Sequence, residues 1–490
     1  MSLPRHAQTR PVPEAAVLDG LPPVREVSAA EVAARIAGGP RLVVLDDDPT
    51  GTQTVADVPV LTSWTVDDLR WALCQDSAVF FVLTNTRSLS PADAAARNRE
   101  VVRALHAAAA AEGTGYVLAS RGDSTLRGHF PLETDVLAEE LTELDGRAPD
   151  GVVLVPAYIE AGRLTVGSHH WMRTTDGLLP VGMSEFARDA TFGYRSSSLP
   201  EWVEEKTGGR VPADEVLRVT LDDLRGGGPA HTARLLSSLR GGRVAVVDAV
   251  CDDDLRVLAL ALARAEESGT RLLYRVGPSF VRARAGQAAR APLTPAALRR
   301  LTPAAVRPPH GGAPHGLVVV GSHMALTTEQ LDRLRERGGI AEYELDVALL
   351  LDEGRRDAHI AEVAAAAADA LDSADAVIRT SRVLVTGADA DDSLAISRRV
   401  SAALVQAVRQ VNAARRPAFV VAKGGITSSD TATHGLRIRR AWARGTLLPG
   451  IVSLWEPVDG PAAGIPYIVF AGNVGGADAL VDALDLLRSA

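Results

Sequence analysis

The chain has 490 residues and a formal net charge of −9, with 46% hydrophobic and 23% charged residues. This length accommodates two or three domains with full cores, and the composition is that of a globular rather than a disordered protein. Acidic and basic residues are interspersed, which excludes the broad basic surface that binds nucleic acid or an anionic membrane. We therefore expect small molecules or proteins as partners.

Cys74 and Cys251 are the two cysteines, and neither has neighbours at metal-ligand spacing. This argues for a reducing compartment and against structural zinc. No stretch reaches the eighteen apolar residues of a membrane helix, and the N-terminal residues lack the apolar core of a signal peptide. We expect a cytoplasmic protein in which residues 1–39 form a peripheral extension.

Apolar strand-like runs alternate with helical patterns along the chain, which predicts an α/β protein with largely parallel sheets flanked by helices. The strand-like runs are Leu42–Leu45, Val79–Leu83, Tyr116–Ala119, Val152–Val155, Val244–Val247, Leu317–Val320, Val383–Val385, Phe419–Ala422 and Tyr467–Phe470. The helical patterns are Ala94–Ala111, Leu255–Glu267, Ile360–Leu371 and Asp392–Val411. A proline-rich break predicts two domains, over residues 40–283 and 316–490, joined by a linker over 284–315.

The first strand runs directly into the acidic loop Asp46-Asp-Asp-Pro-Thr-Gly-Thr-Gln-Thr54. Neighbouring carboxylates repel one another, so a folded chain tolerates them where water, a metal ion or a ligand offsets the charge. Ligands of parallel α/β sheets bind at the carboxyl ends of strands, where this loop lies. The loop therefore indicates a binding site, against the alternative of a solvated turn built on Pro49 and Gly51.

A second polar segment, Arg121-Gly-Asp-Ser-Thr-Leu-Arg-Gly-His129, follows the third strand-like run. Arginine binds a carboxylate in a bidentate fork, while Asp123 and Ser124 bind hydroxyls, so the segment suits a polyhydroxylated anion. The alternative is a helix N-cap at Asp123 or Ser124. Arg87 and Arg163 follow two other strand-like runs and are placed to reach the same ligand.

The second domain carries two glycine-containing loops after apolar runs, Lys423-Gly-Gly-Ile-Thr-Ser-Ser-Asp430 and Gly472-Asn-Val-Gly-Gly476. Each predicts a strand, a glycine turn and a helix start, where backbone amides approach and attract phosphate. Two further strand ends, Gly321-Ser-His-Met-Ala325 and Thr386-Gly-Ala-Asp389, favour a nucleotide site in this domain. Lys423 is one of only two lysines among 52 basic residues, which favours a use of its compact ammonium.

Together these segments resemble those of the four-carbon acid sugar kinase family, from about Leu42 to Leu487. The resemblance implies a sugar-acid binding domain over 40–283, a nucleotide-binding domain over 316–490 and an active site in the cleft between them. The matching segments are Asp47-Asp-Pro-Thr-Gly51, Asp123-Ser-Thr-Leu-Arg-Gly128, Pro156-Ala with Gly162-Arg163, Ser184-Glu-Phe-Ala-Arg-Asp189 and Gly424-Gly-Ile-Thr427.

The resemblance implies an ATP-dependent kinase that phosphorylates the terminal 4-hydroxyl of a four-carbon sugar acid such as threonate, erythronate or a 3-oxo-tetronate. Mg²⁺ would bridge the nucleotide phosphates. The substrate contacts that it implies are Asp47, Asp48, Asp123, Ser124 and Arg127. The nucleotide contacts that it implies are Ser322, Gly424, Gly425, Ile426, Thr427 and Gly472, with Lys423 placed to offset phosphate charge.

In the mechanism we expect, Arg127 and Arg163 hold the substrate carboxylate so that the far hydroxyl points at the γ-phosphate. Asp47 is the first candidate for the base that accepts the hydroxyl proton, and Asp123 is the second; the choice between them requires geometry. The sequence assigns no metal ligands. It departs from the family pattern at Pro49, which replaces leucine, at Gln53 and Thr54, which replace an Asn-Asp pair, and at Arg87, which directly follows a threonine that the family's arginine follows by two residues.

The run Val43-Val-Leu-Asp46-Asp-Asp48-Pro-Thr50 also fits the signature of haloacid-dehalogenase phosphatases, in which Asp46 would be the nucleophile. That hypothesis needs a lysine or arginine and a second acidic motif later in the same domain, and Lys206, the lysine of that domain, does not stand at a strand end. A third hypothesis is a non-catalytic sugar-acid sensor, against which the polar loops of both domains count. The sequence leaves open which sugar acid is used and whether the chain forms a homo-oligomer.

Overall fold

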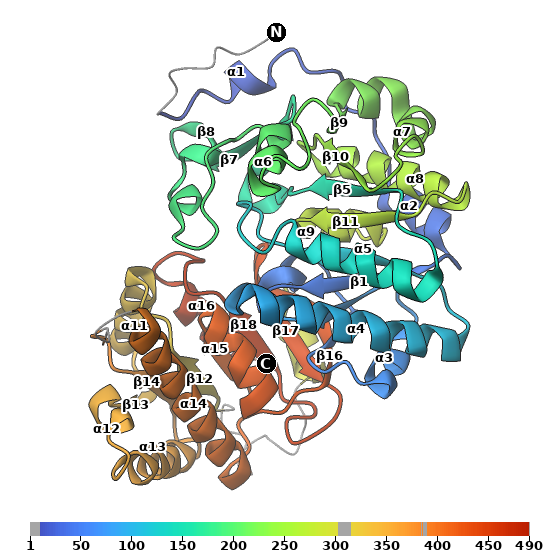
Figure 1. Ribbon diagram of the computed structural model, residues 1–490. Helices are drawn as coiled ribbons and strands as arrows, with labels where there is room; N and C mark the ends of the chain where they lie inside the picture. The colour runs from blue at the N-terminus through green and yellow to red at the C-terminus, as the bar shows by residue number, and fades with distance from the viewer. Residues whose placement is uncertain (1–9, 302–314, 384, 386–389, 490) are drawn as a thin grey trace. The chain divides into compact units, whose positions relative to one another are not determined.

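The computed structural model describes residues 10–301, 315–383, 385 and 390–489 (Figure 1). The chain forms two compact units, of which the first comprises the residues through Asp47 together with Trp64–Ala289. The second comprises Asp48–Ser63 and the residues from Arg290 onward. Residues 48–63, which the sequence prediction placed in the first domain, thus have their contacts in the second unit. No helix in the described ranges is long and apolar enough to cross a membrane.

The first unit is built on a parallel sheet in which β1 (Arg41–Asp46) lies between β3 and β4. The register pairs Asp46 with Leu83 on one side and with Arg121 on the other, so the carboxyl ends of these three strands are level. The residues that follow them therefore meet at one edge of the sheet. The strand order is β3 (Val79–Leu83), β1, β4 (Tyr116–Arg121), β11 (Leu272–Val276), β5 (Gly151–Val155), β10 (Arg243–Val247) and β9 (Leu217–Val219).

Helices flank this sheet, and α4 (Pro91–Glu112) lies beside α5 (Leu132–Asp145) (Figure 1). The bounds of α4 follow from its sequence, because the Ser90 hydroxyl accepts the Asp93 amide at 3.2 Å and Gly113 ends the helix with a φ of 61°. The other helices of the first unit are α1 (Ala15–Leu18), α2 (Ala29–Ile36), α3 (Val66–Leu73), α6 (Leu199–Lys206), α7 (Gly228–Leu236), α8 (Asp252–Glu267) and α9 (Pro278–Arg284).

A small antiparallel sheet, formed by β6 (Arg163–Val166), β7 (His169–Thr174) and β8 (Gly177–Pro180), completes the first unit. Side chains alternate along β7, so His170 is fully buried while its neighbour His169 is not. The Asp248 carboxylate accepts the two backbone amides of the β6–β7 turn at 2.8 and 2.7 Å. Arg163 and His170 therefore lie in the same unit as Asp46 and Asp47.

The second unit has a mixed sheet that is parallel at one side and antiparallel at the other. β2, from the segment 48–63, pairs antiparallel with β16 and so belongs to this sheet. The strand order is β13 (Ile340–Leu345), β14 (Asp375–Thr380), β12 (Leu317–Val320), β15 (Val420–Lys423), β18 (Tyr467–Phe470), β17 (Ile451–Pro457), β16 (Arg440–Leu448) and β2 (Val58–Leu61). The helices are α10 (Pro295–Leu301), α11 (Ala325–Arg337), α12 (Val347–Leu351), α13 (Arg356–Ala370), α14 (Ala390–Ala414), α15 (Gly425–Asp430) and α16 (Ala479–Arg488).

The strand predicted over Val383–Val385 is wrong, because the strand of this region is β14 and Val383 is 78% exposed. The apolar centre of β14, Ala376–Ile378, is fully buried but lies between charged residues, which shortens its pattern in the sequence. In the predicted linker, α10 inserts Leu298 into the core of the second unit. Residues 302–314 of that linker and the predicted strand end Thr386–Asp389 lie outside the described residues.

Candidate active site

The carboxyl end of β1 places two buried carboxylates among arginines from neighbouring strand ends. Asp46 and Asp47 are 2% and 1% exposed. Arg87, in the turn after β3, donates from Nε to Asp47 Oδ2 at 3.0 Å and from Nη2 to Oδ1. The Nη1 atom of Arg121 lies 3.1 Å from Asp46 Oδ1 and 3.4 Å from Asp47 Oδ1. The guanidinium groups thus offset the carboxylate charges. Asp46, Asp47 and Asp48 each place one carboxylate oxygen within 4.8 Å of the other two.

Asp48 has a local structural role as the cap of a short 3-10 helix, η1 (Pro49–Thr54). Its Oδ1 accepts the Thr50 amide at 2.8 Å. Farther along η1, Thr52 Oγ1 accepts the indole N–H of Trp455 at 2.9 Å, and the helix packs against α15. The first half of the predicted acidic motif therefore ends β1 in the first unit, whereas its second half is anchored in the second unit.

The segment after β4 folds into a loop, Gly122–Gly128, that is held by its own side chains. Arg127 Nε donates to Asp123 Oδ2 at 2.7 Å, and the Thr125 hydroxyl donates to the same oxygen. Burial raises the pKa of Asp123, but the charges of Arg87 and Arg127 and these hydrogen bonds outweigh it and hold that pKa below its usual value. Asp123 is therefore ionised at neutral pH, and both of its carboxylate oxygens are hydrogen-bond acceptors.

Two segments distant in the sequence reach this loop. Phe186 lies under Arg127, with 4.8 Å between the guanidinium carbon and the ring centroid, and Asp189 Oδ2 lies 3.6 Å from Arg127 Nη1. Burial lowers the pKa of Arg163, and the nearby charge of Asp123 opposes that shift. The structure thus brings together, in the first unit, the predicted residues Asp47, Arg87, Asp123, Ser124, Arg127 and Arg163.

The sequence analysis did not predict a role for His170, which holds the backbone of Ser124. Its Nε2 lies 2.8 Å from the Ser124 carbonyl oxygen and its Nδ1 2.9 Å from Thr165 Oγ1. A carbonyl only accepts, so Nε2 carries the proton and Nδ1 accepts the threonine hydroxyl. Burial lowers the pKa of His170 to about 4, which keeps the ring neutral. The signal available in the sequence was the His-His pair, since one of two neighbours on a half-buried strand faces inward.

In the second unit, the ends of β12, β15 and β18 bring the predicted nucleotide segments together. A Cβ atom added at Gly321 would lie 2.4 Å from Thr427 Oγ1, and one at Gly424 would lie 2.9 Å from the same atom. A Cβ atom at Gly472 would lie 2.5 Å from Ser322 Oγ. The three strand ends therefore need glycine, because their loops pack closely around Thr427 and Ser322. We call these three loops the cradle; glycine loops at strand ends bind phosphate through their backbone amides.

Lys423, the last residue of β15, is fully buried. Its Nζ donates to the Ala471 carbonyl oxygen at 2.7 Å and lies 3.8 Å from the centroid of the Phe470 ring. Burial lowers the pKa of Lys423 to about 7. The ammonium thus links the glycine loop after β15 to the residue directly before Gly472.

A cavity of about 230 Å³ adjoins the cradle. Thr427 and Ile426 line it beside the glycine loops, and Val383, Val400 and Leu404 supply apolar walls. Ile426 is 59% exposed, which is unusual for an isoleucine and leaves its side chain available to a ligand. A Cβ atom added at Gly425, at the start of α15, would meet no atom within 4 Å. The second unit therefore offers an apolar cavity next to a polar backbone cradle, which is the pairing that a nucleotide base and its phosphates require.

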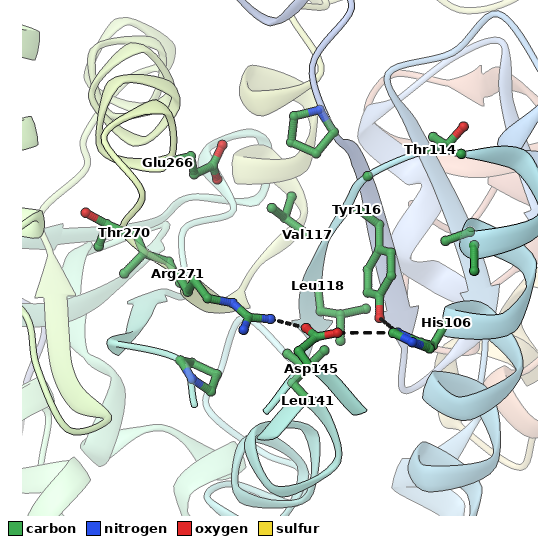
Figure 2. Close-up of a pocket in the computed structure, with 17 residues that line it drawn as sticks. His106, Thr114, Tyr116, Val117, Leu118, Leu141, Asp145, Glu266, Thr270 and Arg271 are labelled. Carbon is green, nitrogen blue, oxygen red and sulfur yellow. Dashed lines mark hydrogen bonds and ion pairs between the residues drawn. The ribbon is translucent and has the colours of Figure 1, made fainter. Parts of the chain in front are cut away.

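A separate cavity of about 540 Å³ lies at the amino ends of the first unit's strands (Figure 2). Asp145 is paired there with Arg271, and its Oδ1 lies 3.5 Å from His106 Nδ1, which is also 3.5 Å from the Tyr116 hydroxyl. Tyr116 begins β4, whereas Asp47 follows the carboxyl end of β1. This cavity is therefore distinct from the site at Asp47.

Comparison with known proteins identifies the class to which these two sites belong. The model of a sugar-binding N-terminal domain matches residues 42–284, and that of a nucleotide-binding C-terminal domain matches residues 317–480. Together with the curated relatives described below, the two domains place the chain in the class of sugar-acid kinases, which are phosphotransferases that use a nucleotide. More particularly, the chain belongs to the four-carbon acid sugar kinase family.

Three curated relatives are kinases of sugar acids. A D-threonate kinase of Bordetella bronchiseptica is 28% identical over 466 residues, which are 92% of this chain and 98% of the relative. A D-erythronate kinase of Heliobacterium modesticaldum is 27% identical over 58% of this chain, and a D-threonate kinase of Cupriavidus necator is 29% identical over 52%. These two matches span 57% and 53% of the relatives' own lengths.

Solved structures share the fold at lower identity. A protein of Salmonella typhimurium LT2 matches 90% of this chain and 98% of its own with a TM-score of 0.63 at 19% identity. A Haemophilus influenzae protein matches 91% of this chain and all of its own with a TM-score of 0.58, also at 19% identity. The family assignment favours the kinase hypothesis over the phosphatase and sensor hypotheses.

Proposed function

We propose that the chain transfers the γ-phosphoryl group of MgATP to the terminal 4-hydroxyl of a four-carbon sugar acid such as threonate, erythronate or a 3-oxo-tetronate. The observation that carries the proposal is the cluster at the carboxyl edge of the first sheet, where arginines alternate with carboxylates in hydrogen-bond contact. Guanidinium groups bind a substrate carboxylate, and ionised aspartates accept its hydroxyls. The names of the relatives support the same substrate class.

In this proposal Arg127 and Arg163 hold the carboxylate of the acid. Arg127 uses its Nε for Asp123, which leaves guanidinium hydrogens for a ligand, and the Nε of Arg163 has no partner among the described residues. Asp123 and the hydroxyl of Ser124 take the substrate hydroxyls. We assign Asp123 to binding because its carboxylate lies in the same loop as Ser124 and is held by Arg127 and Thr125.

Asp47 is the proposed acceptor for the proton of the attacking hydroxyl. Arg87 holds the carboxylate by two hydrogen bonds and so fixes its orientation. Phosphoryl transfer demands little covalent help and depends mainly on positioning and on charge stabilisation. Arg87 therefore serves the reaction both by orienting Asp47 and by supplying positive charge at this edge of the sheet.

The phosphates of ATP would lie in the backbone cradle of Gly424–Thr427, Ser322 and Gly472, and the purine in the apolar cavity beside Ile426. Lys423 would act indirectly, by holding the carbonyl group of Ala471, the residue before Gly472. Mg²⁺ would neutralise charge on the transferring phosphates and is bound in such sites by phosphate oxygens, water and one or two carboxylates. Transfer requires the hydroxyl held by the first unit to reach the γ-phosphate held by the second.

A coupled ADP-release assay with MgATP and a panel of four-carbon sugar acids tests the proposal. We expect one acid to stimulate ADP release in the wild type and Asp47→Ala to lose that stimulation. Asp176→Ala, in the exposed turn between β7 and β8, is the control and should behave as the wild type. The substrate assignment is wrong if MgATP binds but no acid on the panel stimulates ADP release, and the role of Asp47 is wrong if Asp47→Ala keeps the stimulation.

A further inference from the structure

A buried carboxylate outside the predicted set, Glu133, connects three of the strand ends that carry the site. It lies in the first turn of α5 and is 3% exposed. The Thr86 hydroxyl donates to its Oε1, Ser120 Oγ donates to its Oε2 at 3.0 Å, and Arg275 forms an ion pair with Oε2. These partners belong to the turn after β3, to β4 and to β11, so one side chain connects three strands of the sheet, with β1 lying between β3 and β4.

Each of these partners adjoins a group of the candidate site. Thr86 directly precedes Arg87, which holds Asp47, and Ser120 directly precedes Arg121, which contacts Asp46 and Asp47. A shift of either partner is therefore transmitted through one peptide unit to an arginine that contacts a candidate catalytic carboxylate.

Arg275 sets the shape of the loop that carries Asp123. A Cβ atom added at Gly122 would lie 2.3 Å from Arg275 Nη2, and one at Gly128 would lie 2.8 Å from the same atom and 3.0 Å from Asp47 Oδ2. The guanidinium thus occupies the space that side chains would fill at both ends of the loop. Its Nη1 donates to Ser120 Oγ at 2.6 Å, which closes a buried network around Glu133.

We infer that the Glu133–Arg275 pair positions the sugar-acid site by fixing Arg87, Arg121 and the Gly122–Gly128 loop, without touching the substrate. A buried ion pair adds little net stability compared with apolar residues of the same volume, whereas it imposes a strict geometry on its hydrogen-bond partners. The pair is therefore suited to orienting its hydrogen-bond partners rather than to stabilising the fold. This inference rests on the proposed substrate site, whereas its test includes a readout that does not depend on turnover.

The experiment compares Glu133→Gln with Glu140→Gln. Glu140 lies on the same helix, is also 3% exposed and is also paired with an arginine, Arg103 Nε at 2.6 Å, but none of its partners adjoins the site. With the acid that the wild type prefers, Glu133→Gln should lower kcat/KM by about 10- to 100-fold, the range found when the hydrogen-bond partners of metal-ligating side chains are removed. The affinity for MgATP should stay within about twofold of the wild type, and Glu140→Gln should keep both parameters.

Hydrogen exchange of the backbone amides gives the second readout. Glu133→Gln should speed exchange in residues 86–88 and 122–128, and Glu140→Gln should leave these segments unchanged. Wild-type exchange in both segments would overturn the inference even if no sugar acid proved to be a substrate. So would an equal loss of kcat/KM in the two variants, because that result indicates a general effect of removing a buried charge from α5. If Glu133→Gln fails to fold, Ser120→Ala replaces it, because this variant removes one hydrogen-bond donor to Glu133. We expect Ser120→Ala to change kcat/KM and amide exchange in the same direction. Wild-type values of both would overturn the inference.

Discussion

Gly472→Ala tests the cradle of the second unit most directly. The added Cβ atom would lie 2.5 Å from Ser322 Oγ and 3.2 Å from Ser322 Cβ, whereas such atoms essentially never approach within 3.0 Å. Ser322 or the loop must therefore move by at least 0.5 Å, the difference between these distances. Overpacking of this kind costs about 1–3 kcal/mol. If that cost falls on the nucleotide-bound arrangement, the affinity for MgATP drops by about 5- to 150-fold.

Titration calorimetry with MgATP measures this affinity, and Gly476→Ala is the matched control. Gly476 lies in the same loop, but a Cβ atom there meets nothing within 4 Å. We expect Gly476→Ala to bind MgATP as the wild type does. Wild-type affinity in Gly472→Ala, or an equal loss in both variants, would refute the reasoning that Ser322 and Gly472 jointly shape the phosphate site.

Three further predictions concern buried ionisable groups. The pKa of His170, lowered to about 4 from 6.5, lets the unfolded chain bind more protons between these values, so the free energy of unfolding should fall by about 2 kcal/mol from pH 7 to pH 5. Urea denaturation of His170→Asn should show a smaller fall. Asp254→Asn leaves Arg225 buried without its carboxylate, whose oxygens lie at 2.7 and 2.9 Å, and should cost about 3–5 kcal/mol in the same assay. The pKa of Lys423, lowered to about 7 from 10.5, predicts that stability against urea rises between pH 7 and 9; Lys423→Met should lack this rise.

The sequence predicted those parts of the candidate site that are local to one strand end. An apolar run followed by polar residues located Asp47, Asp123 and the glycine loops, because strand ends in a parallel sheet gather at one edge. The family resemblance added their order along the chain. Which atoms meet was not predictable; an example is the buried contact between Lys423 Nζ and the Ala471 carbonyl oxygen.

The groups that the sequence analysis missed act across long separations or within irregular strands. Arg275 lies in β11, more than 140 residues from Glu133, so no local sequence pattern predicts their pairing. The hairpin of β16 and β17 escaped detection because its register shifts between Ala443 and Gly445, which interrupts the alternation of side chains. Propensity and periodicity describe single segments, and these features depend on contacts between segments.

The chain passes from the first unit to the second between Asp47 and Asp48, and this determines which fragments can be expressed as separate units. A fragment that begins at Arg290 would lack β2, so β16 would keep β17 on one side but become an open sheet edge of the kind that promotes aggregation on the other. It would also lose Thr52, which accepts the indole N–H of the buried Trp455. The nucleotide half is therefore discontinuous in sequence, and an autonomous version has to carry residues 48–63 grafted onto it, by a linker or by circular permutation.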